Sequence, residues 1–295
     1  MSNHQQMPSN ASANHLLTVA LIQPDLQWLK PTENLRHLAD MMMQITDDTD
    51  LVVLPEMFTS GFTQKPESVA SGQQAITWMK EQAKLHNVAL TGSVACHVDR
   101  NDEGSMDNGV VDESVKGDAA PYFVNRLLFI TPAGDVTHYD KSHLFQMGGE
   151  HKRYKAGDKR CVVTYKSWRL LLTVCYDLRF PVFCRNQQED CRQEYDAMLC
   201  VANWPAVRRH PWRTLLQARA IENQAYVVGV NRVGVDGNGL LYNGDSIAVN
   251  FQGDILVDGK EGNESVLMTT LSMPLLQDAR QKFPVWQDAD RFTLI

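Results

Sequence analysis

The segment Leu170-Leu-Leu-Thr-Val-Cys175-Tyr-Asp-Leu-Arg-Phe-Pro181 decides how this chain folds. Its first five residues are nearly all apolar, which is typical of a strand buried on both faces of a sheet. The strand carries Cys175 at its carboxyl end, and Pro181 suits the first position of a following helix. Polar side chains converge where strands leave the core. The segment therefore predicts a sheet flanked by helices, with Cys175 at a strand tip.

Similar apolar runs recur along the whole chain. They lie at 17–22, 51–54, 88–94, 123–130, 197–201, 225–230, 246–250 and 266–271. Apolar residues at helical spacing separate some of these runs, after Pro31, over 73–86 and after His210. Later strands follow one another through turn signals at 132–134 and 236–239. Hairpins mixed with crossover helices predict an α/β fold of two mixed sheets packed face to face, with helices outside.

Composition is that of a globular protein and excludes several classes of function. The chain has 295 residues, of which 43% are hydrophobic and 21% are charged. Its 28 Lys+Arg and 35 Asp+Glu give a formal net charge of −7 without a dense basic run, so we expect no nucleic-acid partner. Because no run of about eighteen apolar residues occurs, we expect no membrane span.

Two polar segments differ from the rest of the chain. Residues 1–15 contain neither a basic cluster nor an apolar core, and predict a disordered tail rather than a secretory signal. Residues 99–120 are acidic and contain glycine, which predicts a mobile surface loop. We expect 16–295 to form one domain. The six cysteines are scattered and form no Cys-x-x-Cys pair, which indicates a reducing, cytoplasmic location.

Three reactive residues directly follow strand-like segments. Glu56 comes after Leu-Pro, Lys141 lies just past a strand, and Cys175 ends one. Singly, each has an ordinary alternative: a solvated glutamate, a surface lysine or a core cysteine. Together they suit amide hydrolysis, which needs a thiolate, a base and a donor for the developing oxyanion. A buried carboxylate serves as the base, and a lysine supplies a positive point charge.

These segments resemble the Glu–Lys–Cys signature of the nitrilase superfamily, the carbon–nitrogen hydrolases. The resemblance extends from about Leu17 to the C-terminus. Within the superfamily, the chain looks most similar to the omega-amidase branch. The stretches that carry the resemblance are Leu54-Pro-Glu56, Tyr139-Asp-Lys141-Ser-His-Leu-Phe145, Gly149-Glu150-His151, Cys175-Tyr-Asp-Leu-Arg-Phe-Pro181, Ala202-Asn-Trp-Pro205 and Ala218-Arg-Ala-Ile-Glu-Asn-Gln-Ala-Tyr226.

The resemblance implies a role for each motif residue. Glu56 would be the general base, Lys141 the oxyanion partner and Cys175 the nucleophile that forms a thioester. Glu150 would position the lysine and the substrate, and the backbone N–H of Tyr176 would be the second oxyanion donor. The resemblance also implies a four-layer α-β-β-α sandwich, a homodimer, and neither cofactor nor metal. The implied reaction is hydrolysis of the terminal amide of 2-oxo acids such as 2-oxoglutaramate and 2-oxosuccinamate.

Residues next to the motifs are candidates for the walls of a substrate pocket. The aromatic candidates are Phe62, Phe145 and Trp204, each of which has a simple packing role as its alternative. A substrate that ends in a carboxylate also calls for an arginine. The arginine candidates are Arg179, Arg208 and Arg209.

Other functions stay open on the sequence alone. A nitrilase, a carbamoylase or another amidase would share the fold and the Glu-Lys-Cys triad, so the pocket side chains decide between them. A protein that acts only by association would keep the fold without catalysis. Ammonia release across a panel of amides and nitriles separates these possibilities.

Cys175 is predicted to be the one cysteine whose loss abolishes turnover, because it lies at a strand tip beside a base. Iodoacetamide at one equivalent, followed by peptide mapping, should find the label on Cys175. Preferential labelling of Cys184 or Cys191 with parallel loss of activity would contradict the assignment.

Overall fold

The computed structural model describes residues 15–69, 72–98, 122–189, 192–259 and 261–290. The expected tail over 1–15, except His15, and the expected loop over 99–120 lie outside these residues. Within the described ranges, no helix has both the length and the apolar character needed to cross a bilayer.

The first large sheet has the strand order β16-β1-β2-β3-β4-β5. Strands β1, β2 and β3 are parallel, whereas β4 is antiparallel to both β3 and β5, so β5 runs in the same direction as β1 to β3. The strands are β1 (Leu16–Gln23), β2 (Leu51–Val53), β3 (Ala89–Val98), β4 (Tyr122–Ile130), β5 (Val136–Asp140) and β16 (Ser265–Ser272).

The second large sheet has the order β15-β14-β11-β10-β7-β6, with β7, β10 and β11 parallel. Its strands are β6 (Cys161–Tyr165), β7 (Trp168–Val174), β10 (Ala197–Val201), β11 (Tyr226–Val230), β14 (Ile247–Val249) and β15 (Ile255–Asp258). Two short hairpins complete the described strands. They pair β8 (Gln188–Glu189) with β9 (Arg192–Gln193), and β12 (Val233–Val235) with β13 (Leu241–Asn243).

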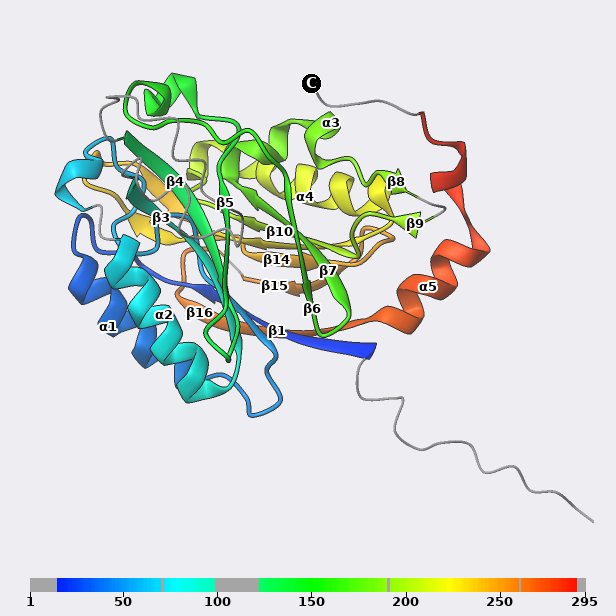
Figure 1. Ribbon diagram of the computed structural model, residues 1–295. Helices are drawn as coiled ribbons and strands as arrows, with labels where there is room; N and C mark the ends of the chain where they lie inside the picture. The colour runs from blue at the N-terminus through cyan, green and yellow to red at the C-terminus, as the bar shows by residue number, and fades with distance from the viewer. Residues whose placement is uncertain (1–14, 70–71, 99–121, 190–191, 260, 291–295) are drawn as a thin grey trace, which may run out of the picture.

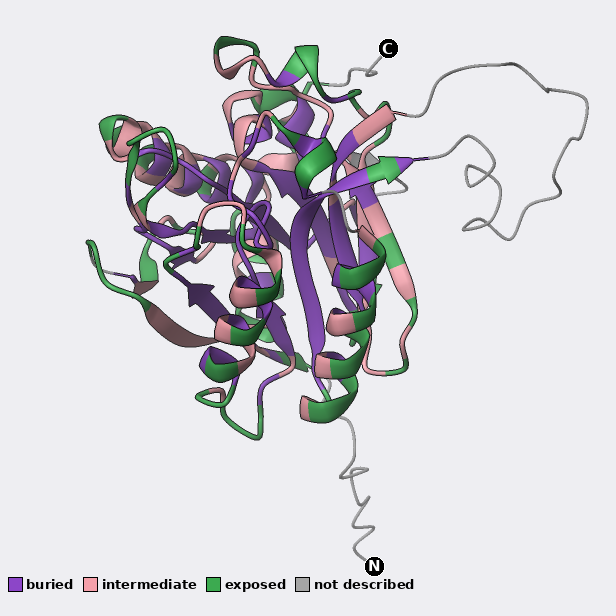
Figure 2. Cartoon of the chain, turned by 90° about the vertical axis from the view of Figure 1, so that its left-hand side faces the viewer, coloured by how far each residue is buried: buried purple, intermediate pink, exposed green. Residues whose placement is uncertain are grey.

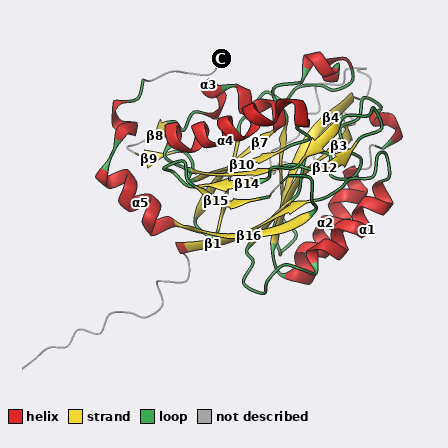
Figure 3. Cartoon of the chain, turned by 180° about the vertical axis from the view of Figure 1, so that it is seen from behind, coloured by secondary structure: helices red, strands yellow, loops and turns green. Residues whose placement is uncertain are grey.

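Helices cover the outer faces of the two sheets (Figures 1 and 3). Helices α1 and α2 lie on the first sheet, and α3 and α4 on the second. The helices are α1 (Pro31–Met42), α2 (Gly72–His86), α3 (Pro181–Cys184), α4 (Arg209–Asn223) and α5 (Met273–Lys282). The short 3-10 helices are Pro66–Ser68, Gln146–Gly148, Glu150–Lys152, Cys175–Arg179, Ala206–Arg208 and Val285–Asp288.

Strand β1 shows why the layers form. Leu17 and Val19 pack between the two sheets, while Ala20 and Ile22 face α1 and α2. Successive side chains of a strand point to opposite faces, so a continuous apolar run buries both faces of a sheet. Figure 2 shows these buried strands flanked by helices with exposed outer surfaces. The predicted four-layer α-β-β-α sandwich is confirmed.

The structure also corrects several expectations. The apolar runs did not reveal β6, β15 or α5, because β6 and β15 are short edge strands and all three elements keep part of their surface exposed. The helix expected from Pro181 is present as the short α3 (Pro181–Cys184), and a separate 3-10 turn, Cys175–Arg179, precedes it. There the Asp177 carboxylate accepts a hydrogen bond from the N–H of Val174, at 2.9 Å, and closes the turn tightly.

Candidate active site

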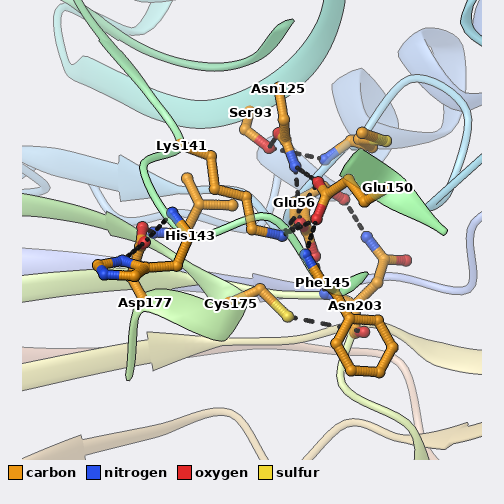
Figure 4. Close-up of polar contacts among 12 residues, drawn as sticks. Glu56, Ser93, Asn125, Lys141, His143, Phe145, Glu150, Cys175, Asp177 and Asn203 are labelled. Carbon is orange, nitrogen blue, oxygen red and sulfur yellow. Dashed lines mark hydrogen bonds and ion pairs between the residues drawn. The ribbon is translucent and has the colours of Figure 1, made fainter. Parts of the chain in front are cut away.

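Four side chains meet where strands of the two sheets end (Figure 4). Glu56 and Lys141 follow β2 and β5 of the first sheet, and Cys175 and Asn203 follow β7 and β10 of the second. The two sheets therefore contribute jointly to one site. The structure brings the sequence-predicted Glu56, Lys141, Glu150 and Cys175 together around a single cavity or its immediate wall.

A buried ion-pair cluster forms the floor of this site. The Nζ of Lys141 lies 2.9 Å from Oε1 of Glu56, and 3.1 and 2.9 Å from Oε1 and Oε2 of Glu150. All three side chains are fully buried. The amide of Asn125 donates to both carboxylates, at 2.8 and 3.1 Å. One ammonium and one amide thus hold two carboxylates at a fixed separation.

Burial and charge set the protonation of this cluster. Burial by itself would lower the pKa of Lys141, but the charges of Glu150 and Glu56 raise it well above its ordinary value. The lysine is therefore an ammonium. Burial raises the pKa of Glu150, and the charge of Glu56 raises it further, while Lys141 opposes both effects.

The cysteine rests as a thiol. Burial raises the pKa of Cys175 well above its ordinary value, and the charge of Glu56 adds to this effect against that of Lys141. Its Sγ lies 3.9 Å from the backbone carbonyl oxygen of Asn203. Attack by this sulfur consequently requires a base at the moment of reaction.

A chain of hydrogen bonds orients Glu56. The N–H of Met57 donates to Oγ of Ser93 at 3.0 Å, and Ser93 donates to Oδ1 of Asn125 at 2.8 Å. The NH₂ group of Asn125 is thereby turned toward the carboxylates. From the other sheet, the N–H of Asn203 donates to Oε2 of Glu56 at 2.8 Å, and its side-chain amide donates to the Glu56 carbonyl. Sequence reasoning missed both asparagines.

Asp177, also missed as a site residue, joins the cysteine turn to the lysine loop. Its buried carboxylate accepts from the N–H of Val174, just before the cysteine, and from the hydroxyl of Tyr139 at 2.8 Å. It also accepts from the N–H and ring of His143, at 3.1 and 2.8 Å. Because Tyr139 and His143 flank the lysine, this carboxylate fixes the cysteine relative to the ammonium. The cysteine itself has φ 48°, a strained conformation for a non-glycine residue.

The cavity beside the cysteine has a volume of about 140 Å³. The candidate wall residues Phe62, Phe145 and Trp204 all line it, as does Tyr176. Gln64, which sequence reasoning missed, also lines it, and its amide atoms are buried without a hydrogen-bond partner within the described residues. In the same part of the chain, no group of three or more His, Cys, Asp or Glu is arranged to hold a metal ion.

The three candidate arginines differ in whether they line the cavity. Arg179 and Arg208 line the cavity. Arg209 does not, because it pairs with Asp245 at 2.7 Å and with Glu261 at 3.0 Å on the outer surface.

Replacing Lys141 with Met should destabilise the protein in a pH-dependent way. Loss of the cation leaves two buried carboxylates unpaired, and breaking a buried ion pair from one side costs about 3–5 kcal/mol. Burial already raises the pKa of Glu150 despite the lysine, and the rise grows without it. A carboxyl with a raised folded-state pKa stabilises below its unfolded pKa and loses that contribution as pH rises. The deficit in melting temperature should therefore be larger at pH 8 than at pH 5.

Circular dichroism at pH 5, 6.5 and 8 measures this deficit. Lys166→Met is the matched control, because Lys166 pairs with Asp50 at the surface, with 46% of its side chain exposed. A surface pair contributes about 0–1 kcal/mol, so its deficit should be small at every pH. An equal deficit for Lys141→Met at all three pH values would contradict the charge assignment.

Known proteins are similar in sequence to this chain over most of its length. A family model for carbon-nitrogen hydrolases matches residues 18–281. The chain is 44% identical to omega-amidase YafV of Escherichia coli (strain K12) over 279 residues, 94% of this chain and 98% of that protein. It is 34% identical to the 2-oxoglutaramate amidase of Paenarthrobacter nicotinovorans over 246 residues, 81% of this chain and 78% of that protein.

A solved structure of the same superfamily has the same fold as this chain. XC1258 from Xanthomonas campestris, a CN-hydrolase superfamily protein with an arsenic adduct in its active site, superposes with a TM-score of 0.85 at 40% identity. The match covers 95% of this chain and 100% of that one. The family model spans Glu56, Lys141, Glu150 and Cys175 together. On this evidence, the chain belongs to the carbon–nitrogen hydrolase family, the nitrilase superfamily.

Proposed function

We propose that this chain is an omega-amidase that hydrolyses the terminal amide of small 2-oxo acids such as 2-oxoglutaramate and 2-oxosuccinamate. The buried Glu56–Lys141–Glu150 cluster beside Cys175, in a small pocket, is the observation that carries the proposal. Drug-sized ligands occupy pockets of about 300–1,000 Å³, so about 140 Å³ suits a short substrate. The names of the two amidase relatives point to the same substrate class.

Acylation begins with the thiol of Cys175. Glu56 accepts the thiol proton while the sulfur attacks the amide carbon, so a C–S bond forms and the carbonyl electrons move onto oxygen. The ammonium of Lys141 and the backbone N–H of Tyr176 stabilise that oxyanion. Tyr176 lies in the first turn of its helix, where backbone N–H groups have no partner within the helix itself.

Ammonia leaves in the next step. Glu56 passes its proton to the amide nitrogen, the C–N bond breaks, and a thioester to Cys175 remains. A water molecule then gives a proton to Glu56 and attacks the thioester carbon. The C–S bond breaks, the sulfur regains its proton, and the acid is released. One carboxylate thus acts as base and acid alternately.

Glu150 keeps Lys141 in place for this work. Its two oxygens lie 3.1 and 2.9 Å from Nζ, so a single N–H can serve both. Glu56 takes a second N–H, which leaves the third for the substrate oxygen. Glu150 also accepts from the N–H of Phe145 at 2.6 Å, which ties the pocket wall to the catalytic cluster.

Ammonia release at equal substrate concentration tests the proposed activity. We expect 2-oxoglutaramate and 2-oxosuccinamate to be hydrolysed far better than glutamine or asparagine, whose ammonium lies next to the carboxylate and would face the guanidinium groups of Arg179 and Arg208 that line the cavity. Nitriles should be poor because they lack the planar carbonyl oxygen that the oxyanion donors require. Glu56→Gln should lower turnover by about 10²–10⁴-fold, as loss of a general base does.

The same panel contains the contradicting outcomes. Equal or better turnover of a nitrile, or of an N-carbamoyl amino acid, would favour a nitrilase or a carbamoylase with the same triad. No turnover of any amide by the folded protein would favour a protein that acts by association. Near-full activity of Glu56→Gln would contradict the mechanism.

We also propose that the chain forms a homodimer in the cytoplasm. Large apolar side chains are exposed on the helical layer over the second sheet, with Val182 on α3 and Ile221 on α4 more than half exposed. Apolar surface of this kind favours association. The five cysteines that the structure describes are free thiols, which suits a reducing compartment.

Light scattering coupled to gel filtration tests the dimer. We expect twice the chain mass of 33.3 kDa, and we expect Ile221→Arg to lower it by placing a charge in the interface. Leu85→Arg is the control, because Leu85 is 70% exposed on α2, over the other sheet. A monomeric wild-type protein, or a dimer lost only in the control, would contradict the proposal.

A further inference from the structure

We propose that Arg179 and Arg208 together bind the carboxylate of the substrate and so select short anionic amides. The inference rests on the proposed function, because it assumes an amide substrate that carries a carboxylate at its other end.

Arg179 and Arg208 have no acidic partner among the residues that the structure describes. Within the described ranges, neither side chain forms an ion pair or a hydrogen bond, although both line the cavity. Their neighbours along the chain differ: Arg209 pairs with Asp245, and Arg213 pairs with Asp258 at 2.7 Å. The fold therefore leaves two guanidinium groups unneutralised at one pocket. Two such groups suit a carboxylate, which accepts paired N–H bonds from arginine.

Aromatic rings hold both guanidinium groups in position. The Cζ of Arg179 lies 5.0 Å from the ring centroid of Trp204, and that of Arg208 lies 5.3 Å from the centroid of Phe145. Stacking on a ring engages the face of a guanidinium and keeps its N–H edge free for a ligand. The indole N–H of Trp204 also donates to the backbone oxygen of Arg208 at 2.7 Å. The clamp is thus partly ordered before any ligand arrives.

The floor of the cavity would reject a carboxylate. Glu56 and Glu150 place two acids around the single cation of Lys141, and all three side chains are buried. Like charges repel strongly where little water screens them. An anionic amide is therefore expected to enter with its amide toward Cys175 and its carboxylate toward the arginines.

The remaining acid on the pocket wall is already engaged. Oδ1 of Asp236 accepts from the N–H groups of Asn238 and Leu240, at 2.8 and 3.0 Å. Oδ2 accepts from the hydroxyl of Tyr242 at 3.1 Å. These bonds bind Asp236 to its own hairpin turn, so it leaves the arginines available to a ligand.

Kinetics on charged and neutral amides test the clamp. In Arg208→Met and Arg179→Met, kcat/KM for 2-oxoglutaramate should fall about 10–100-fold each, the loss expected when a charge-assisted hydrogen bond is removed. Turnover of butyramide, which is neutral, should stay within about twofold. Arg208→Lys keeps the charge but not the paired N–H groups, so it should be intermediate. Arg36→Met, on the exposed side of α1, is the control and should behave as wild type.

A second readout does not depend on turnover. The product analogue 2-oxoglutarate should protect Cys175 of the wild type from iodoacetamide, and each arginine variant should need at least about tenfold more of it. Arginine-dependent protection without any hydrolysis of 2-oxoglutaramate would overturn the proposed function and keep the clamp. Hydrolysis and protection equal to wild type in both arginine variants would overturn the clamp and keep the function. Equal losses on 2-oxoglutaramate and butyramide would also overturn it, because they would indicate a merely structural role.

Discussion

The ammonium of Lys141, enclosed by Glu56 and Glu150, is the interaction on which the rest of the structure depends. Removing three charges from water costs several kcal/mol per ion, and only close pairing with further hydrogen bonds offsets it. Here the offset comes from amide and backbone donors on Asn125, Asn203 and Phe145. Because these donors belong to both sheets, the cluster forms only when the sandwich is complete, so the site and the fold are stabilised together.

Strand direction explains how so many donors reach one place. β2 and β5 run in the same direction in the first sheet, and β7 and β10 run in parallel in the second. Residues that follow the carboxyl ends of these strands therefore meet at one end of the sandwich, where both sheets contribute side chains. Asp177 then fixes the position of the cysteine turn relative to the lysine loop, because its carboxylate accepts hydrogen bonds from both. The reacting groups lie on strand ends and tight turns, which gives the rigid positioning that catalysis requires.

The sequence predicted what depends on continuous apolar patterns or on motifs. Strands such as β7 were visible because both of their faces are buried, and Glu56, Lys141 and Cys175 were visible because each lies at or just past the end of a strand-like segment. β6 was missed because Cys161-Val-Val-Thr-Tyr165 is a short edge strand that is mostly only half-buried. Asn125 looked like an ordinary residue within a strand. Arg208 and Arg209 are adjacent in the sequence, and only the three-dimensional position of Asp245 distinguishes their roles.

The protonated resting state of Cys175 has a consequence for the life of the protein in an oxidising cell. Peroxides and electrophiles react with thiolates far faster than with thiols. An enzyme whose sulfur keeps its proton until an amide arrives is therefore a poor target for peroxides between turnovers, whereas iodoacetamide is itself an amide and can react in the pocket with Glu56 as the base. Burial and the nearby charge of Glu56 raise the pKa of the Cys175 thiol, and they thereby slow its oxidation while no substrate is bound. Low-pKa cysteine enzymes gain speed of attack but lack this protection.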